Sequence, residues 1–89
     1  MELRHLRYFA GVAEMENVSR AALKLHVSQP ALSAQIRDLE DEIGFLLFER
    51  TAKSVRLTQA GQAFLGGLRF LVIGFRFQVL RGQIGGHDI

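Results

Sequence analysis

The break between two short predicted helices, at residues 25–28, constrains the fold of this chain more than any other feature. The first of these helices is expected to end near His26. Ser28 can then accept hydrogen bonds from the free backbone N–H groups of a new helix, and Pro30 fits its first turn because the missing N–H would be unpaired there. The helix before the break has a face of small residues that lets a neighbouring helix approach closely: Ala21, Ala22 and Leu25. Two helices joined this tightly predict a helix-turn-helix.

Apolar residues recur at helical spacing on both sides of this break. An amphipathic first helix is predicted over about residues 3–15 from Leu3, Leu6, Phe9, Ala10 and Ala13. Asn17 is then expected in a turn, with Ser19 as the cap of the short second helix. In the third helix the apolar positions step by four, three and four up to Gly44, which suits a helix end: Leu32, Ile36, Leu39 and Ile43.

The segment after Gly44 predicts a small hairpin and a fourth helix. The apolar run 46–48 and the alternation of Val55 and Leu57 about Arg56 indicate two strands joined by a loop at 50–54. Thr58 is expected to cap the next helix. The predicted fold is therefore mainly α, a winged helix-turn-helix with a three-helix core and a small β-hairpin wing, followed by a fourth helix. Its expected parts are residues 1–58 for the winged domain, 59–82 for the fourth helix, and 83–89 for a frayed tail.

Composition narrows the classes of function. A chain of 89 residues fits one domain and leaves no room for a catalytic domain beside a regulatory one. The sequence has no Cys, which excludes disulfides, thiolate metal sites and a cysteine nucleophile. The His residues are scattered, and the acidic residues at 38–42 are expected to form a solvated face, so we expect no enzyme, no cofactor and no metal site. The charged N-terminus is unlike a signal peptide, which favours a cytoplasmic protein.

The distribution of charge is more informative than the net charge of +2. Residues 1–58 hold eight basic and eight acidic side chains and are neutral overall. Within them, however, the stretches 19–37 and 50–56 are basic and contain no acidic residue. Residues 59–89 hold three Arg against one Asp and so carry the whole surplus. A neutral domain with two separate basic stretches is compatible with binding to nucleic acid.

The start of the third helix has the residue types needed to read DNA. A helix N-terminus inserted in a major groove offers side chains to base edges, while its free N–H groups attract phosphates. Gln29 can pair with adenine, Pro30 can contact a thymine methyl group, and Ser33 can bond a phosphate or a base. The acidic residues at 38–42 lie further along the same helix, where they are expected to be held away from the DNA.

A family resemblance supports this interpretation. The chain contains the runs MELRHLRYF (1–9), SRAA (19–22), HVSQPALS (26–33), LFER (47–50) and LTQAG (57–61), with Gln35-Ile36, Leu39-Glu40 and Gly44 between them. Over about residues 1–65 it resembles the N-terminal domain of LysR-type transcriptional regulators. The resemblance implies a helix-turn-helix at about 18–37 and a linker helix through which two copies pair. It also implies that Gln29, Pro30 and Ser33 lie at the DNA, with Lys53 on the wing. The full set of expected contact residues is Ser19, Arg20, Ser28, Gln29, Pro30, Ser33, Ala34, Arg37 and Lys53.

The sequence departs from the family in two places. Ala34 stands where many members have Arg, which removes a possible bidentate contact to guanine or phosphate. The segment 66–77 is apolar on nearly all sides, whereas the family's linker helix is polar and amphipathic. The effector-binding domain that follows in the family is absent from this sequence. We therefore expect an isolated DNA-binding domain with no small-molecule effector site, acting as a dimer on a two-fold operator of double-stranded DNA.

The apolar segment admits several hypotheses. The expected dimerisation face consists of Phe64, Leu68, Leu71 and Phe75, while Phe70, Val72, Ile73 and Phe77 would stay exposed and favour association beyond a dimer. A membrane span is not expected, because Arg69 and Arg76 interrupt the stretch. The alternative function is an interaction module, in which the apolar tail pairs with a full-length regulator and blocks it.

Overall fold

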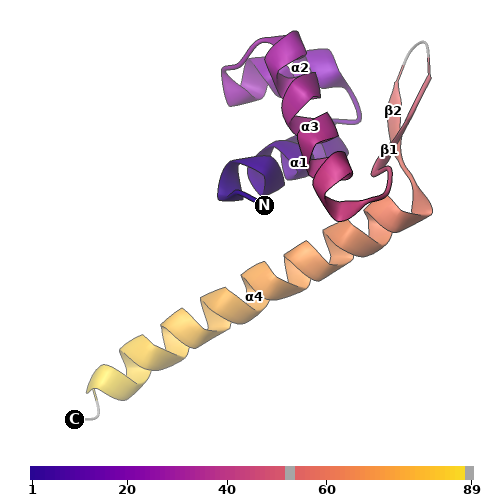
Figure 1. Ribbon diagram of the computed structural model, residues 1–89. Coiled ribbons are helices and arrows are strands. Elements are labelled where there is room, and N and C mark those ends of the chain that lie inside the picture. The colour runs from indigo at the N-terminus through magenta and orange to yellow at the C-terminus, as the bar shows by residue number, and fades with distance from the viewer. Residues whose placement is uncertain (52–53, 88–89) are drawn as a thin grey trace.

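Three short helices pack together ahead of a hairpin and one long helix (Figure 1). The computed structural model describes the backbone of residues 1–51 and 54–87, and the side chains up to residue 74 within those ranges. The elements are α1 (Leu3–Met15), α2 (Val18–Leu25), α3 (Gln29–Ile43), β1 (Phe48–Arg50), β2 (Val55–Leu57) and α4 (Gln59–His87). This order confirms the mainly helical, winged helix-turn-helix fold that the periodicity predicts.

The core lies where the apolar stripes of α1, α2 and α3 meet the base of the hairpin. Phe9 is fully buried and links these parts, because the centroid of its ring lies 5.4 Å from the ring centroid of Phe48 and 5.2 Å from that of Phe64. Such tilted and edge-on ring pairs stabilise the core by more than the burial of their apolar area alone would. The buried apolar residues are Phe9, Val12, Ala21, Ala22, Leu32, Ile36, Leu39, Leu47, Phe48 and Val55. Apart from Ile43, which is half-buried, the predicted stripe of α3 is fully buried.

The turn between α2 and α3 has the boundaries that the sequence predicts. His26 adopts the left-handed conformation with φ 59°, and its N–H donates to the carbonyls of Ala22 and Leu23. The hydroxyl of Ser28 accepts from the backbone N–H of Ala31 at 3.2 Å, so Ser28 caps α3. Gly44 ends the same helix with φ 86°. The two helices of the motif are thus separated by three residues whose backbone groups are used in capping.

The prediction that Ser19 caps α2 is wrong. The cap is Asn17, whose side-chain oxygen accepts from the N–H of Arg20 at 3.0 Å and whose carbonyl accepts from Ala21 at 3.0 Å. The preceding Glu16 ends α1 in the left-handed conformation, and its carbonyl accepts from the N–H of Val55 at 3.4 Å. This contact holds the turn in place, so α2 begins two residues earlier than a Ser19 cap would allow.

The wing is a two-stranded antiparallel hairpin in which Phe48, Glu49 and Arg50 pair with Leu57, Arg56 and Val55. The first strand begins at Phe48 rather than at Leu46 as expected, because the backbone before it is already engaged. The carbonyl of Leu46 accepts from the Thr58 hydroxyl at 2.7 Å, and the carbonyl of Leu47 accepts from the Thr58 N–H at 3.0 Å.

Glu40 is not on a solvated face, which corrects the expectation for the acidic residues at 38–42. It is 7% exposed, and its Oε2 accepts from the N–H groups of Leu47 at 2.7 Å and Phe48 at 3.3 Å. Asp38, Asp41 and Glu42 are exposed, as predicted. A buried carboxylate is stable here because two backbone donors replace its water. Glu40 therefore fastens α3 to the base of the wing.

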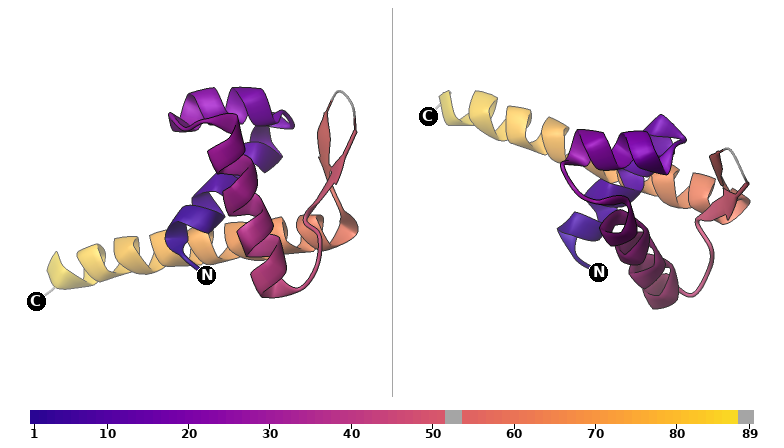
Figure 2. Two further views of the ribbon diagram at one scale, coloured as in Figure 1. Left: turned by 45° about the horizontal axis from the view of Figure 1, so that its top comes forward. Right: turned by 90° about the horizontal axis from the view of Figure 1, so that it is seen from above.

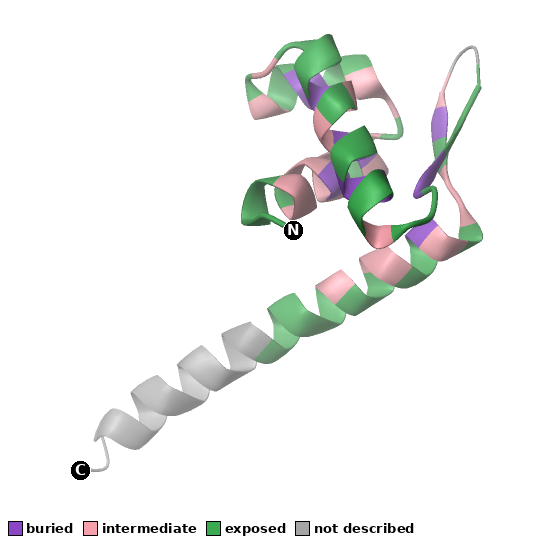
Figure 3. Ribbon diagram, in the orientation of Figure 1, coloured by how far each residue is buried: buried purple, intermediate pink, exposed green. Residues whose placement is uncertain are grey.

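Helix α4 begins as predicted and continues further than predicted. The Thr58 hydroxyl accepts from the N–H of Gly61 at 2.9 Å, which caps the helix. The helix then runs past α1 and out beyond the three-helix domain (Figure 2). It ends at His87, whereas the sequence predicts an end at residue 82 and a frayed tail over 83–89. Among its described side chains, the buried and half-buried ones lie between Ala60 and Leu68, and Figure 3 shows the described turn that follows, up to residue 74, as exposed. Among the helices of the described residues, none combines the length and hydropathy that crossing a membrane requires.

Candidate nucleic-acid interface

The exposed face at the start of α3 carries most of the predicted contact residues. Leu32, Ile36 and Leu39 are buried on the inner side, so the residues between them face outward. Gln29 and Pro30 are exposed in the first turn, and Ser33 is half-buried one turn later. Ala34 and Arg37 continue the same exposed face. The helix thus offers a polar, uncharged tip, with one cation two turns further along.

The start of α2 lies directly beside this tip. Because Asn17 is the cap, Ser19 falls inside the first turn of α2 with a hydroxyl that capping does not use. The Nε2 atom of Gln29 donates a hydrogen bond to the Ser19 hydroxyl oxygen, across ten positions in the sequence. Arg20 is exposed next to Ser19. The structure therefore brings Ser19, Ser28 and Gln29 together, as the predicted site requires.

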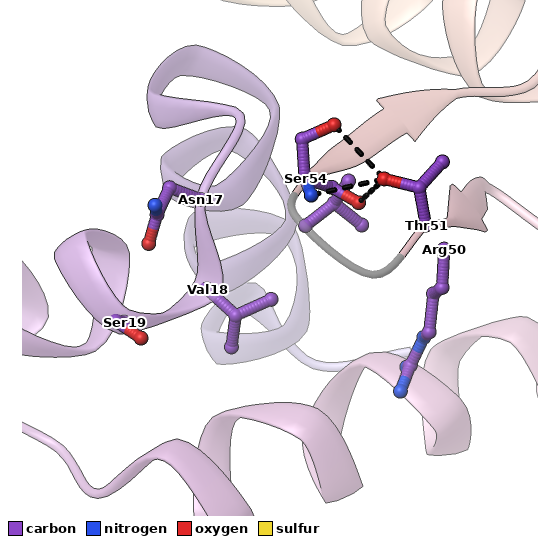
Figure 4. Close-up of a pocket in the computed structure, with 7 residues that line it drawn as sticks. Asn17, Val18, Ser19, Arg50, Thr51 and Ser54 are labelled. Carbon is purple, nitrogen blue, oxygen red and sulfur yellow. Dashed lines mark hydrogen bonds between the residues drawn. The ribbon is translucent and has the colours of Figure 1, made fainter.

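The wing completes one side of this surface through a residue that the predicted site omits. A pocket between α2 and the hairpin is lined by Asn17, Val18, Ser19, Arg50, Thr51, Ser54 and Val55 (Figure 4). The Thr51 hydroxyl donates to the Ser54 carbonyl at 2.9 Å and accepts from the Ser54 N–H at 2.9 Å, which orders this end of the hairpin. Arg50 is an exposed cation in the same pocket as Ser19. Arg50 lies within the acid-free basic stretch 50–56, which is the sequence feature that points to it. The predicted wing contact, Lys53, lies outside the described residues.

Arg37 lies in different electrostatic surroundings from the tip of the helix. It lines a groove that also includes Asp41, Glu49 and Arg50. Carboxylates beside a cation lower its net attraction for a phosphate. Within the described part of the chain, no cluster of three or more His, Asp or Glu side chains could hold a metal ion.

The predicted dimerisation face is divided by the structure. Phe64 is half-buried and packs edge-on against Phe9, and Leu68 also packs against the core. Leu71 is 70% exposed, and the side chain of Phe75 lies outside the described residues. Phe70, Val72 and Ile73 are exposed, as the sequence predicts, while Phe77 lies outside the described side chains. An apolar groove runs between α1 and α4, lined by Leu3, Leu6, Arg7, Ala10, Glu14, Leu65, Leu68, Arg69, Val72 and Ile73. Among the described residues, the accessible apolar surface of this region is therefore the groove together with Phe70 and Leu71, while Phe64 already packs against the core.

Comparison with known proteins places this geometry in a family context. The family model described as "Bacterial regulatory helix-turn-helix protein, lysR family" matches residues 3–62. The HTH-type transcriptional regulator TfdS of Cupriavidus pinatubonensis is 48% identical over 95 aligned residues, which cover 100% of this chain and 32% of that protein. The chain thus spans about a third of the length of this relative.

Two solved structures superpose on nearly the whole chain. The crystal structure of a CbnR_DBD–DNA complex has a TM-score of 0.81 at 40% identity, and covers 97% of this chain and 99% of its own. The crystal structure of a BenM_DBD/catB site 1 DNA complex has a TM-score of 0.81 at 41% identity, and covers 93% of this chain and 92% of its own. Both of these structures are complexes with DNA.

Proposed function

The chain belongs to the LysR family of bacterial regulatory helix-turn-helix proteins, and on that premise we propose that it binds double-stranded DNA in a sequence-specific manner. The recognition element is the first turn of α3, which enters the major groove. The observation that carries the proposal is the exposed tip formed by Gln29 and Pro30, with Ser19 of α2 bonded to it. The DNA in the two solved relatives supports the same assignment.

The contact residues divide into base readers and phosphate binders. Gln29 and Pro30 stand at the helix tip and read base edges, while Ser33 bonds a base or a phosphate. The N-terminal turns of α2 and α3 offer backbone N–H groups and hydroxyls to phosphates on either side of the groove. The phosphate set includes Ser19, Arg20, Ser28 and Arg37, with Arg50 and Lys53 on the wing. Ala34 is too short for a polar contact and meets the DNA as an apolar surface.

Two copies of the chain pair so that their recognition helices meet the half-sites of a two-fold operator. The apolar groove between α1 and α4 and the exposed Leu71 support this pairing, because monomeric proteins in water rarely expose a large contiguous apolar surface. The half-sites would lie about one turn of DNA apart, or a multiple of it.

This pairing is tested by a charge on the exposed part of α4. Leu71→Asp is expected to raise the dimer dissociation constant by at least about tenfold, because it would bury an unpaired charge at the interface. Leu23→Asp, at a site 77% exposed on α2, is the matched control and should leave self-association unchanged in sedimentation. A chain that stays monomeric at high concentration, or equal effects of both variants, contradicts this pairing.

The proposal assigns no reaction to the chain, because the relatives are named as transcriptional regulators. It places the chain in the cytoplasm, with the DNA it binds. The alternative of an interaction module that only blocks another regulator is not favoured, because the helix-turn-helix has its caps and its exposed reading face in place.

Selection of bound sites from a random DNA pool, followed by gel-shift titration, tests the function directly. Gln29→Ala is expected to cost about 1–3 kcal/mol on the selected site and to remove the preference at one position of each half-site. Lys53→Ala should weaken binding to selected and random DNA alike and reduce the salt slope by about one. Equal losses on both kinds of DNA for both variants contradict the division of roles. No enrichment of any sequence contradicts sequence-specific binding itself.

A further inference from the structure

The hydrogen bond between Ser19 and Gln29 has a consequence for which base is read. We propose that Ser19 is a positioning residue that fixes the orientation of the Gln29 carboxamide and so makes Gln29 select adenine over guanine. This inference rests on the proposed function, because it concerns the residue assigned there to base reading.

The contact joins the two helices of the motif at their exposed ends. Gln29 is the first residue of α3, and Ser19 is in the first turn of α2, held there by the Asn17 cap. The Nε2 atom of Gln29 donates to the Ser19 oxygen. Both residues are exposed, so the bond does not serve to satisfy a buried group. The bond gives the amide nitrogen of Gln29 a partner within the same chain, and leaves the second N–H and the oxygen of the carboxamide for the DNA.

The remaining groups of the carboxamide match adenine. A Gln side chain has two N–H donors and one oxygen acceptor. With one N–H bonded to Ser19, the outward edge offers one donor and one acceptor. Adenine presents N7 as an acceptor and N6 as a donor in the major groove, which this edge complements. Guanine presents two acceptors, N7 and O6, so O6 would face the Gln29 oxygen.

A hydroxyl alone could also hold the carboxamide in the opposite orientation, because it can donate as well as accept. In that orientation the hydroxyl would donate to Oε1, and both N–H groups of Gln29 would face the DNA and suit guanine. A phosphate removes this ambiguity. Ser19 lines a pocket to which Arg50 of the wing also contributes and lies in the first turn of α2, and both features favour an anion there. Phosphate oxygens only accept, so the hydroxyl proton of Ser19 turns to the phosphate and only its lone pairs remain for Gln29.

The test compares base preference at the position that Gln29 reads. That position is identified as the one at which Gln29→Ala removes the preference in site selection. The ratio of affinities for adenine and guanine there is then measured by gel shift for the wild type, Ser19→Ala and Ser19→Thr. The wild type should prefer adenine. Ser19→Ala should lower the ratio about fivefold, which corresponds to the loss of one hydrogen bond of about 1 kcal/mol. Ser19→Thr keeps the hydroxyl and should restore the ratio.

A matched control separates orientation from general loss of contact. Ser54→Ala removes a hydroxyl on the other side of the same pocket, while the Thr51 hydroxyl keeps its bonds to the Ser54 carbonyl and N–H. It should leave the ratio unchanged. An unchanged ratio in Ser19→Ala, with lower affinity for both bases, overturns the proposal and leaves Ser19 as a phosphate contact only. A Gln29→Ala variant that alters no position also overturns it, whereas the proposed function fails only if the wild-type chain selects no sequence.

Discussion

The winged domain and the long helix that leaves it differ in what surrounds their glycines. At Gly61, in the first turns of α4, an added Cβ would lie 2.1 Å from the carbonyl oxygen of Leu47. At Gly66, Gly67 and Gly74, further along the same helix, an added Cβ would meet nothing within 4 Å. The family model ends at residue 62, between these two groups. Residues up to about 65 are therefore specified by close packing within the chain, whereas the described side chains of α4 from 69 to 74 are exposed and leave room for another molecule.

The largest expected effect is at the crossing of α4 over the segment before β1. Gly61→Ala forces the backbone of Leu47 to move, and Leu57 lies 3.0 Å from the same added atom. The Leu47 carbonyl would lose its bond from Thr58, so we expect a loss of about 3 kcal/mol or more in the free energy of unfolding. Urea denaturation followed by circular dichroism measures this loss.

Gly11→Ala is the control for that variant. Its added Cβ would meet only the side chain of Leu25, whose Cδ1 lies 3.0 Å away and can rotate. Because Ala also favours the helix by up to about 1 kcal/mol, the net change should be close to zero. A Gly61→Ala variant as stable as Gly11→Ala would show that the crossing is loose, and the contrast with the rest of α4 would disappear.

A second large effect is expected where α3 is fastened to the wing. Glu40→Ala leaves the N–H groups of Leu47 and Phe48 without their acceptor at a buried site. Each hydrogen bond to a charged group contributes about 1.5–3 kcal/mol, so a total loss of about 3 kcal/mol is expected in the free energy of unfolding. Asp41→Ala, at the next and exposed position, should change stability by less than about 0.5 kcal/mol. Equal losses for the two variants would place Glu40 with the solvated acidic residues, as its sequence context suggests.

Glu40 also makes a contact that the sequence alone does not predict. The helices, the turn at His26 and the caps Ser28, Gly44 and Thr58 follow from local rules, since each depends on residues within one or two turns. The two N–H groups that donate to Glu40 belong to Leu47 and Phe48, seven and eight positions further along the chain, on a segment whose path is set by tertiary packing. Its spacing from Ile36 and Ile43 puts Glu40 at the edge of the buried helix stripe, but that spacing does not identify the backbone groups that it binds.

The exposure of the predicted contact residues on α3 follows from the sequence to the extent that one helix face defines it. The buried stripe of α3 leaves Gln29, Pro30, Ala34 and Arg37 outside, and the structure agrees. The position of Ser19 was not predictable in the same way, because Asn17 and Ser19 are both good capping residues two positions apart. In the structure Asn17 is the cap, and the turn before it also contacts the wing, since the carbonyl of Glu16 accepts from the N–H of Val55 of β2. The nearness of Arg50 to Ser19 likewise depends on how the wing folds back on α2.

The smallest expected effect has the opposite sign and lies in the free part of α4. Gly67→Ala adds a methyl group where the structure has open space, so it should favour the helix by up to about 1 kcal/mol. The measurement is the helical signal at 222 nm and the amide exchange of neighbouring residues, with Gly66→Ala as the matched variant. Both should increase helicity if this face of α4 meets only solvent. A gain in Gly66→Ala accompanied by weaker self-association in Gly67→Ala would mean that a second copy packs closely at Gly67. In that case this part of α4 would also be specified by close packing, but against a second copy of the chain and not against its own winged domain.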